Sequence, residues 1–554
     1  QWFVEQLERK QTDTIRVNYN GPDDGIIELD PKEFPEVPYG FMTWTNTDGD
    51  FYPGADKAWA WGAGAGGTCV MWNRNNGVVF AGVGVRNEPS TNGVAHAIER
   101  AIHGENPLVS SPVAAAGELS PEPGVPGVGT ALPVPPATKT IDHLGPFAMW
   151  RRIEIALAGP DSRSRGEPNP FAIAVEGVFT APSGRRWTVP GFFDGNGSGR
   201  PDGSVWRVRF SADEAGEWTF ASHSSDSLLD GWTAGFTVTT APTDAPGLYR
   251  WGRLEALGTP ANPIRYLKFR DGPYWLKAGC DDPENFLGKS RNYDTNAKRM
   301  AAIDYLAARG INSLYIMTHN LDGDNKDVWP WLGDTTREAK ANGGTNARFD
   351  VARLQQWLEV YEHMQSKGMV TYLVLEDDSA WKGYDHGRYY REIIARFGHL
   401  PGLILNFNEE FNENYPLSEA LAFMKVLAEL DPYDHPRGIH NMNLPDDTYV
   451  DAAFIDFASI QTGSPGRQAA GGLAHNQLAI DWIRGCRDRN RRVLMVGFDE
   501  GRPEEDRRAW WAAYLGGAVW EAHLKPPYDR PPSAWESVWH ELGGTRVFVE
   551  SMPF

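Results

Sequence analysis

The feature that most constrains the fold is an alternation of strand-length apolar runs with helical patterns, which begins at residue 273. Alternation of this kind is typical of βα units. The eight runs are Tyr274–Cys280, Ile311–Met317, Val370–Leu375, Leu403–Phe407, Gly438–His440, Phe457–Ile460, Val493–Phe498 and Gly517–Trp520. Eight such units predict a closed (β/α)₈ TIM barrel. A doubly wound parallel sheet is the alternative, but it usually has fewer strands and does not close.

Residues 140–248 show a different pattern, in which short alternating runs are separated by turn signals such as Asp194-Gly195-Asn196-Gly197. The runs are Trp150–Ala156, Phe171–Phe179, Ser204–Phe210, Glu217–Ser222 and Gly235–Thr239. Many short strands at this spacing predict an antiparallel β-sandwich. We therefore expect a multidomain chain in which the sandwich precedes a barrel at residues 249–554.

The N-terminal segment, residues 1–106, carries two strand-like runs, Gly67–Trp72 and Val78–Val85, around the turn Asn75-Asn76-Gly77. This arrangement predicts a β-hairpin, and a helix is expected after it at Val94–Ile102. Residues 107–139 are rich in Pro, Gly and Ala and have no periodicity, which predicts a linker. The chain begins at Gln1 without a signal peptide, so we expect a processed form or a fragment.

Composition excludes several classes of partner. The 554-residue chain has a formal net charge of −20, which argues against nucleic acid and anionic membranes. No apolar run reaches the ~18 residues of a membrane span. The three cysteines, Cys69, Cys280 and Cys486, are too far apart for a zinc-type spacing. We expect no metal and no cofactor, and the sequence does not set the oligomeric state.

Polar and aromatic residues gather where the predicted barrel strands end, which is where barrel enzymes carry their active sites. Acidic pairs follow the fourth strand, at Glu409-Glu410, and the seventh, at Asp499-Glu500. One such acid usually caps a helix or solvates a loop, but the two pairs together favour a site, because buried carboxylates are costly. The candidate binding residues at the other strand ends are His319, Asn320, Trp329, Trp331, Glu376, Trp381, Asn408, His440, Gln461 and Trp520.

Two carboxyl groups that face each other across a barrel mouth suit one reaction in particular. Cleavage of a glycosidic bond needs one carboxyl group to protonate the leaving oxygen and a second to act as nucleophile or to activate water. Burial or a neighbouring carboxylate can raise the pKa of the acid as required. The paired acids therefore predict a retaining glycoside hydrolase, and tryptophans near the strand ends are candidate sugar platforms.

Several stretches resemble bacterial clan A glycoside hydrolases, in which a DUF5060-like β-sandwich precedes a (β/α)₈ barrel. They are MTHNLDGDNKDVWPWL at 317–332, RFDVARLQQWLEVYEHMQSKG at 348–368, GRYYREIIARFGH at 387–399, NFNEEFN at 406–412 and GFDE at 497–500. The resemblance covers most of residues 140–554. It implies a carbohydrate substrate and a secreted or periplasmic bacterial protein.

The resemblance also implies roles for the acidic pairs. In clan A the acid/base is the Glu of an Asn-Glu pair after strand four, and the nucleophile is a Glu after strand seven. A literal match to Asn408-Glu409 makes Glu409 the acid/base. Aligning Asn406 with the first Asn of the relatives' NLGEEN motif selects Glu410 instead, which we prefer. Glu500 is the expected nucleophile, with Asp499 beside it.

Two other hypotheses remain. Residues 1–106 resemble the C-terminal part of serine β-lactamase-like hydrolases, but that part of the chain has no Ser-x-x-Lys. The Ser379–Lys382 spacing lies in another domain. We therefore expect an inactive remnant rather than a serine hydrolase. The barrel could instead be degenerate and bind carbohydrate without cleaving it. The sandwich could bind sugar or serve as a scaffold packed against the barrel.

Overall fold

The computed structural model describes residues 10–12, 39–40, 43–45, 59–64, 68–73, 79–83, 139–259, 266–280, 286–288, 292–321, 328–376, 381–441, 451–461, 473–491, 495–499, 507–522 and 531–552. The chain forms two compact units, Gln1–Glu122 and Pro123–Phe554. Within the described residues, no helix is both long enough and apolar enough to cross a bilayer.

The first unit contains an antiparallel sheet in which each strand pairs with the next along the chain. Its strands are β1 (Lys10–Thr12), β2 (Tyr39–Gly40), β3 (Thr43–Thr45), β4 (Trp59–Gly64), β5 (Thr68–Asn73) and β6 (Val79–Val83). The pairing of β5 with β6 confirms the predicted hairpin. Its turn, the helix expected at Val94–Ile102 and nearly all of the predicted linker lie outside the described residues. The likeness to β-lactamases therefore stays a prediction.

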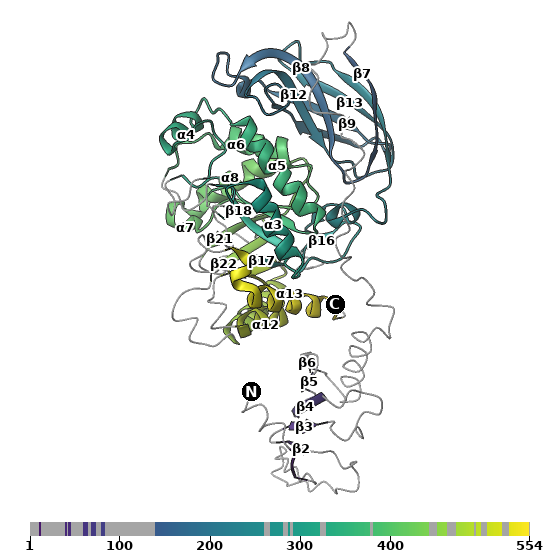
Figure 1. Ribbon diagram of the computed structural model, residues 1–554, viewed down its shortest axis with the longest axis vertical. Coiled ribbons are helices and arrows are strands. Elements are labelled where there is room, and N and C mark those ends of the chain that lie inside the picture. Colours follow the sequence, from purple (N-terminus) through teal and green to yellow (C-terminus); the bar gives the residue numbers. More distant parts are fainter. Residues whose placement is uncertain are drawn as a thin grey trace. The chain divides into compact units, whose positions relative to one another are not determined.

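The second unit begins with two packed sheets, drawn in blue in Figure 1, with strand orders β10-β9-β13-β14-β7 and β11-β12-β8. These are β7 (Thr140–Ala148), β8 (Ile153–Arg163), β9 (Val175–Thr180), β10 (Arg186–Pro190), β11 (Phe192–Phe193), β12 (Asp202–Phe210), β13 (Gly216–Ser224) and β14 (Thr233–Thr239). Alternate residues face the core, as in β14, where Ala234, Phe236 and Val238 are buried. The β-sandwich is confirmed, although its β7–β14 pair is parallel.

The rest of the second unit is a closed barrel of eight parallel strands. They are β17 (Ala278–Cys280), β18 (Ser313–Met317), β19 (Val370–Val374), β20 (Leu403–Asn406), β21 (Arg437–Asn441), β22 (Phe457–Gln461), β23 (Met495–Asp499) and β24 (Val519–Ala522). β17 pairs with both β18 and β24, and this closes the barrel. The predicted TIM barrel is thereby confirmed, since all eight strands overlap the predicted runs.

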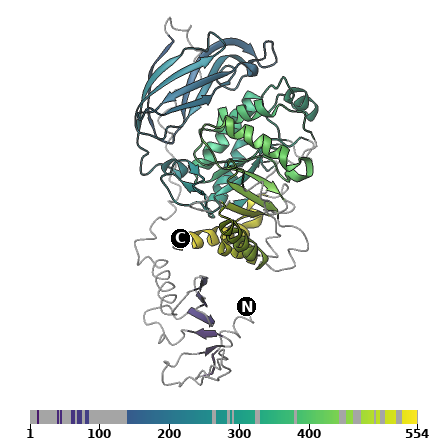
Figure 2. The same ribbon diagram turned by 180° about the vertical axis from the view of Figure 1, so that it is seen from behind.

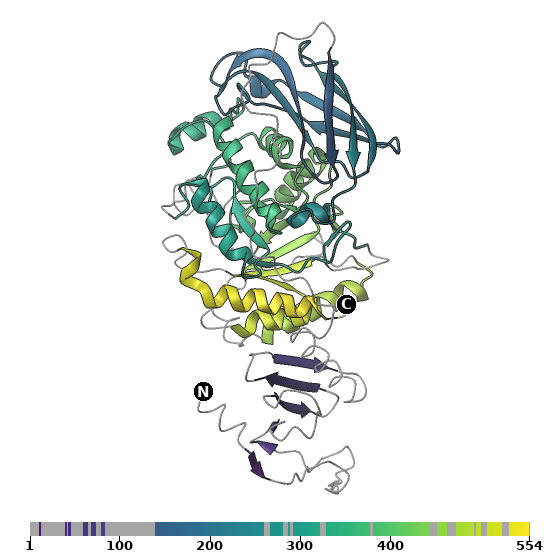
Figure 3. The same ribbon diagram turned by 45° about the vertical axis from the view of Figure 1, so that its right-hand side comes forward.

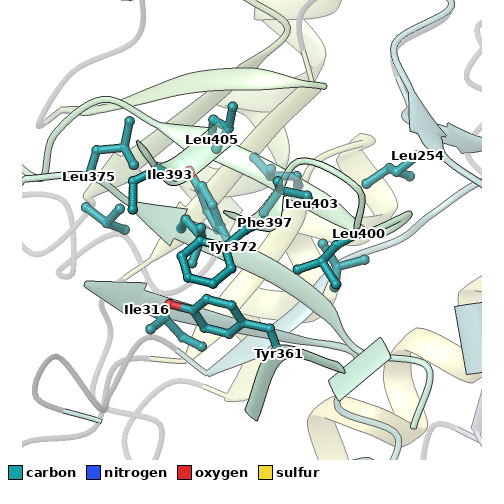
Figure 4. Packing of buried hydrophobic residues seen from close by; sticks show 14 of the residues in the cluster. Leu254, Ile316, Tyr361, Tyr372, Leu375, Ile393, Phe397, Leu400, Leu403 and Leu405 are labelled. Atoms are coloured by element: carbon teal, nitrogen blue, oxygen red, sulfur yellow. The ribbon is translucent and has the colours of Figure 1, made fainter. Parts of the chain in front are cut away.

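Helices surround the barrel, as the view from behind and the view with the right-hand side turned forward show (Figure 2, Figure 3). They are α3 (Asn296–Ala307), α4 (Thr336–Gly343), α5 (Val351–Ser366), α6 (His386–Phe397), α7 (Phe411–Asn414), α8 (Leu417–Leu430), α11 (Leu473–Asp488), α12 (Arg507–Gly516) and α13 (Glu536–Glu550). In α5, the Asp350 side chain accepts from the Arg353 amide and caps the first turn. Figure 4 shows Tyr361 of this helix beside Ile316 and Tyr372 of the barrel strands. An apolar helix face thus packs against the barrel wall.

The sandwich packs directly on α5 and α6 of the barrel, where buried polar contacts join the two domains (Figure 1). Arg396 of α6 donates to the Phe193 carbonyl at 2.7 Å and pairs with Asp194. Arg209 of β12 donates to Gln355 of α5 at 3.2 Å. These contacts show that the sandwich packs against the barrel.

Candidate active site

Closure of the barrel places the carboxyl ends of all eight strands at one rim. β20 ends at Asn406, and β23 ends at Asp499, whose backbone partner on β22 is Gln461. The residues that follow β20 therefore share this rim with the end of β23. Glu500 lies outside the described residues, as does the side chain of Asp499.

The two glutamates after β20 form a tight turn before α7. Both side chains are partly exposed, whereas Asn408 before them is fully buried. The Glu409 amide donates to the Glu376 carbonyl at 2.9 Å. Glu410 adopts the left-handed conformation, with φ 44° and ψ 44°, and its amide donates to Nδ1 of His440 at 3.1 Å. The neighbouring strands on both sides thus fix the backbone of this turn.

Glu376 lies beside the turn, two residues beyond β19. Its carboxyl group is buried and accepts hydrogen bonds from Tyr384 at 2.6 Å and from Tyr415 at 2.9 Å. Burial raises its pKa to about 8, although hydrogen bonds from Tyr384, Tyr415 and Asn408 oppose this shift. Glu376 is therefore mostly protonated at neutral pH and links the ends of strands three and four.

His319 lies in an aromatic cluster at the end of β18. Its ring packs edge to face with the rings of Trp331 and Tyr384, each at a centroid distance of 4.8 Å. It makes the same kind of contact with Trp381, at a centroid distance of 5.7 Å. Burial lowers the pKa of His319 to about 3, so the ring is neutral. Within the described part of the chain, neither ring nitrogen of His319 has a hydrogen-bond partner. The side chain of Asn320, also fully buried, points its amide at the Met317 sulfur at 3.6 Å.

The four predicted sugar platforms differ in their exposure. Trp329, Trp331 and Trp520 are buried, so their rings pack within the protein. Trp381 is partly exposed and offers the more accessible ring. Trp520 lies on the helix-facing side of the barrel, where its ring packs against that of His475 in α11 with 5.3 Å between the ring centroids. The structure therefore does not bring Trp520 together with the glutamates of the turn.

Gln461 and His440 lie on neighbouring strands of the rim. His440 is buried in β21 and lies 6.1 Å from the Tyr315 ring, measured between centroids. Gln461 is partly buried at the end of β22. Among the predicted residues, the structure thus groups Glu376, Asn408, Glu409, Glu410 and His440 around one turn. Among the described residues, no group of three or more His, Cys, Asp or Glu side chains is placed to hold a metal ion.

Sequence reasoning missed two tyrosines and a buried ion pair. Tyr384 and Tyr415 donate to Glu376 from loops after the third and fourth strands. Lys277 and Glu521 form an ion pair in the barrel interior, with the ammonium 4.2 Å from the centre of the Tyr372 ring. Glu521 could be predicted to lie at a strand end, but its partner depends on the closing register of β17 and β24.

Comparison with known proteins agrees with this architecture. Residues 147–225 match the model of DUF5060, a domain of unknown function. No curated protein matches the chain. A solved structure of a putative glycoside hydrolase from Bacteroides vulgatus matches with a TM-score of 0.57 and 19% identity, over 74% of this chain and 79% of that one.

Two more distant structures also match. One is a glycoside hydrolase family 5 protein from Bacteroides vulgatus, with 12% identity over 56% of this chain and 73% of that one, and a TM-score of 0.42. The other is a family 5 mannosidase from Rhizomucor miehei, with 11% identity over 53% of this chain and 98% of that one, and a TM-score of 0.39. The DUF5060 match and the match to the putative glycoside hydrolase confirm the predicted resemblance at the level of fold, a β-sandwich followed by a (β/α)₈ barrel.

Proposed function

We propose that this protein is a retaining glycoside hydrolase that cleaves O-glycosidic bonds in polysaccharides or oligosaccharides. The observation that carries the proposal is the turn at Glu409-Glu410, which the closed barrel holds at the same rim as the end of β23. Because a polysaccharide cannot cross a membrane unaided, this substrate class favours a secreted or periplasmic location.

In the proposed reaction, Glu500 attacks the anomeric carbon while Glu410 protonates the leaving oxygen. The bond to the leaving group breaks as a covalent glycosyl–enzyme ester forms on Glu500. Glu410, now a carboxylate, then takes a proton from water, which attacks the anomeric carbon and releases Glu500. Both steps invert the anomeric carbon, so the product keeps the configuration of the substrate. Retention requires the two carboxyl groups to lie about 5–5.5 Å apart.

The backbone supports Glu410 rather than Glu409 as the acid/base. A left-handed conformation costs a non-glycine residue on the order of 1–2 kcal/mol, and Glu410 adopts it with φ 44°. Asn or Gly would adopt this conformation at lower cost. A glutamate in this conformation supports a role for its carboxyl group, since strain of this kind concentrates at functional sites.

The test of these roles uses Glu410→Gln and Glu500→Gln, with Glu409→Gln and Asp499→Asn as matched controls. Two aryl glycosides serve as substrates, one with a poor leaving group and one with an activated group such as dinitrophenol. Loss of the acid should abolish turnover of the first glycoside but leave formation of the covalent intermediate from the second. Loss of the nucleophile should abolish turnover of both.

The controls decide between the members of each pair. If Glu409→Gln shows the leaving-group dependence and Glu410→Gln does not, the acid/base is Glu409. Full activity in both Glu410→Gln and Glu500→Gln would overturn the assignment. A screen across β-glucans, xylan, mannan and arabinans would identify the sugar. Sugar binding without turnover in the unmodified protein would favour the non-catalytic alternative.

A further inference from the structure

The turn that carries Glu409 and Glu410 is hydrogen-bonded to the strands on both sides of it. On the β19 side, the Glu409 amide donates to the Glu376 carbonyl at 2.9 Å. On the β21 side, the His440 amide donates to the Asn408 carbonyl at 3.3 Å. Both of these contacts are between backbone groups. A third contact uses a side chain, because the Glu410 amide donates to Nδ1 of His440 at 3.1 Å.

We propose that His440 is a positioning residue for the acid/base, and that its Nδ1 holds the left-handed conformation of Glu410. This inference rests on the proposed function for its catalytic consequence. The structural part of the inference is that the Glu410 backbone depends on an acceptor at Nδ1. This part rests only on the hydrogen bond from the Glu410 amide to His440.

The acceptor on His440 is fixed before any substrate binds. The residue lies within β21, and it aligns with Ser459 on the next strand. Its side chain is only 2% exposed and meets the Tyr315 ring nearly edge to face. Because Nδ1 accepts from an N–H group, a neutral ring carries its hydrogen on Nε2. An imidazole with one tautomer and little freedom can therefore hold a strained backbone in place.

Loss of this acceptor removes the hydrogen bond that stabilises the left-handed conformation of Glu410. Its amide would lose the acceptor that Nδ1 supplies. Relaxation to a negative φ would relieve the conformational cost but redirect the side chain of Glu410. A displacement of about 1 Å at a reacting group can lower the rate by about 100-fold. The expected effect is therefore on kcat more than on KM.

The experiment compares His440→Phe with His440→Asn in the full chain. Phenylalanine keeps the ring beside Tyr315 but has no acceptor, whereas the Asn oxygen lies near the position of Nδ1. His475→Phe is the control, because His475 is also buried and packs edge-on against Phe498 and Trp520. If His440→Phe folds poorly, His440→Gln serves in its place, since its amide extends beyond the Nδ1 position.

We expect His440→Phe to lower kcat about 100-fold with KM changed less than about threefold, and His440→Asn to recover most of kcat. Crystal structures should show a negative φ at Glu410 in His440→Phe and a positive φ in His440→Asn. A positive φ at Glu410 in His440→Phe would overturn the proposal, as would unchanged kcat in a protein that Glu410→Gln inactivates. If the unmodified protein cleaves no glycoside, the proposed function fails, and the φ comparison alone decides the role of His440.

Discussion

Glu376 is a buried carboxyl group that accepts hydrogen bonds from two tyrosines beside the strand-four turn. It tolerates burial because it is largely neutral, since desolvation raises its pKa to about 8. A neutral carboxyl group there can hold Asn408 and the turn without adding a second negative charge next to Glu409 and Glu410. The pKa of Glu376 thus links the structure of the site to pH.

The raised pKa means that the folded protein binds this proton more tightly than the unfolded chain does. The stabilisation is fully present below the unfolded pKa of 4.5 and is lost as pH rises through about 8. Between pH 4 and pH 9, the free energy of unfolding of the unmodified protein should fall by on the order of 3–5 kcal/mol more than that of Glu376→Gln. Denaturant unfolding at both pH values measures this difference.

A matched control for Glu376→Gln is Glu429→Gln on α8, where the side chain is exposed. It should follow the pH dependence of the unmodified protein. If Glu376→Gln follows that dependence too, then Glu376 does not retain its proton through neutral pH.

Single residues of the site were only partly predictable. The acids at Glu409 and Glu410 could be located, since they follow an apolar run at a fixed position. The contact between Glu410 and His440 could not, because it depends on the register of β20 and β21 and on a positive φ. The tryptophans show the same limit: the sequence placed Trp329 and Trp331 near the rim, but both are buried, and Trp331 packs against His319.

At the scale of elements, β17 and β24 close the barrel, and a buried ion pair joins Lys277, immediately before β17, to Glu521 of β24. Neither side chain has more than 1% exposure. The Lys277 ammonium also lies over the rings of Tyr372 and Phe457. This charge pair fills the interior beneath the rim and ties the first strand to the last.

Removal of one partner should be far more costly than removal of both. Lys277→Met leaves a carboxylate buried near aromatic rings and should destabilise the protein by about 3–5 kcal/mol. The double variant with Glu521→Met should recover most of that loss, since apolar replacement of a buried pair is often neutral. Denaturant midpoints measure both effects.

The control for this pair is Lys425→Met on α8, whose partner Glu429 is also exposed, and it should change stability by less than about 1 kcal/mol. Equal losses in Lys277→Met and in the double variant would show that packing volume, and not charge, holds β17 to β24.

Elements were the most predictable level of the structure. The eight barrel strands are apolar because helices cover one side of them and the barrel interior the other. In the sandwich, β7 (Thr140–Ala148), β10 (Arg186–Pro190) and the two-residue β11 (Phe192–Phe193) were missed. All three are edge strands of their sheets. β7 and β10 each contain a proline, which edge strands tolerate but which weakens the strand pattern.

At the scale of the whole molecule, the interface between sandwich and barrel is built from buried charges and aromatic rings. Arg396 is fully buried, pairs with Glu392 at 2.6 Å and with Asp194, and lies over the Phe192 ring at 4.1 Å. Arg253 is likewise buried, between the rings of Trp187 and Tyr433. An interface of this kind favours two domains that move and unfold together.

Arg396→Met should therefore destabilise both domains at once, by about 3–5 kcal/mol, because it leaves the buried carboxylate of Glu392 without its partner. Hydrogen exchange in denaturant should show β12 of the sandwich and β19 of the barrel opening together, and earlier than in the unmodified protein. The control is Arg388→Met on the same helix. The Arg388 side chain is partly exposed, and its Nε lies 3.7 Å from Oδ2 of Asp385. Opening of β12 alone would show that the sandwich is an independent module.

In the proposed reaction, a carboxyl group after β23 attacks the sugar while one after β20 supplies the proton. The most direct measurement is peptide mapping after reaction with a 2-fluoro glycoside of whichever sugar the enzyme cleaves, since such compounds form a glycosyl–enzyme that hydrolyses slowly. One label is expected, on the peptide that contains Glu500, and no label in Glu500→Gln. A label on another peptide, or hydrolysis with inversion and no label, would contradict it.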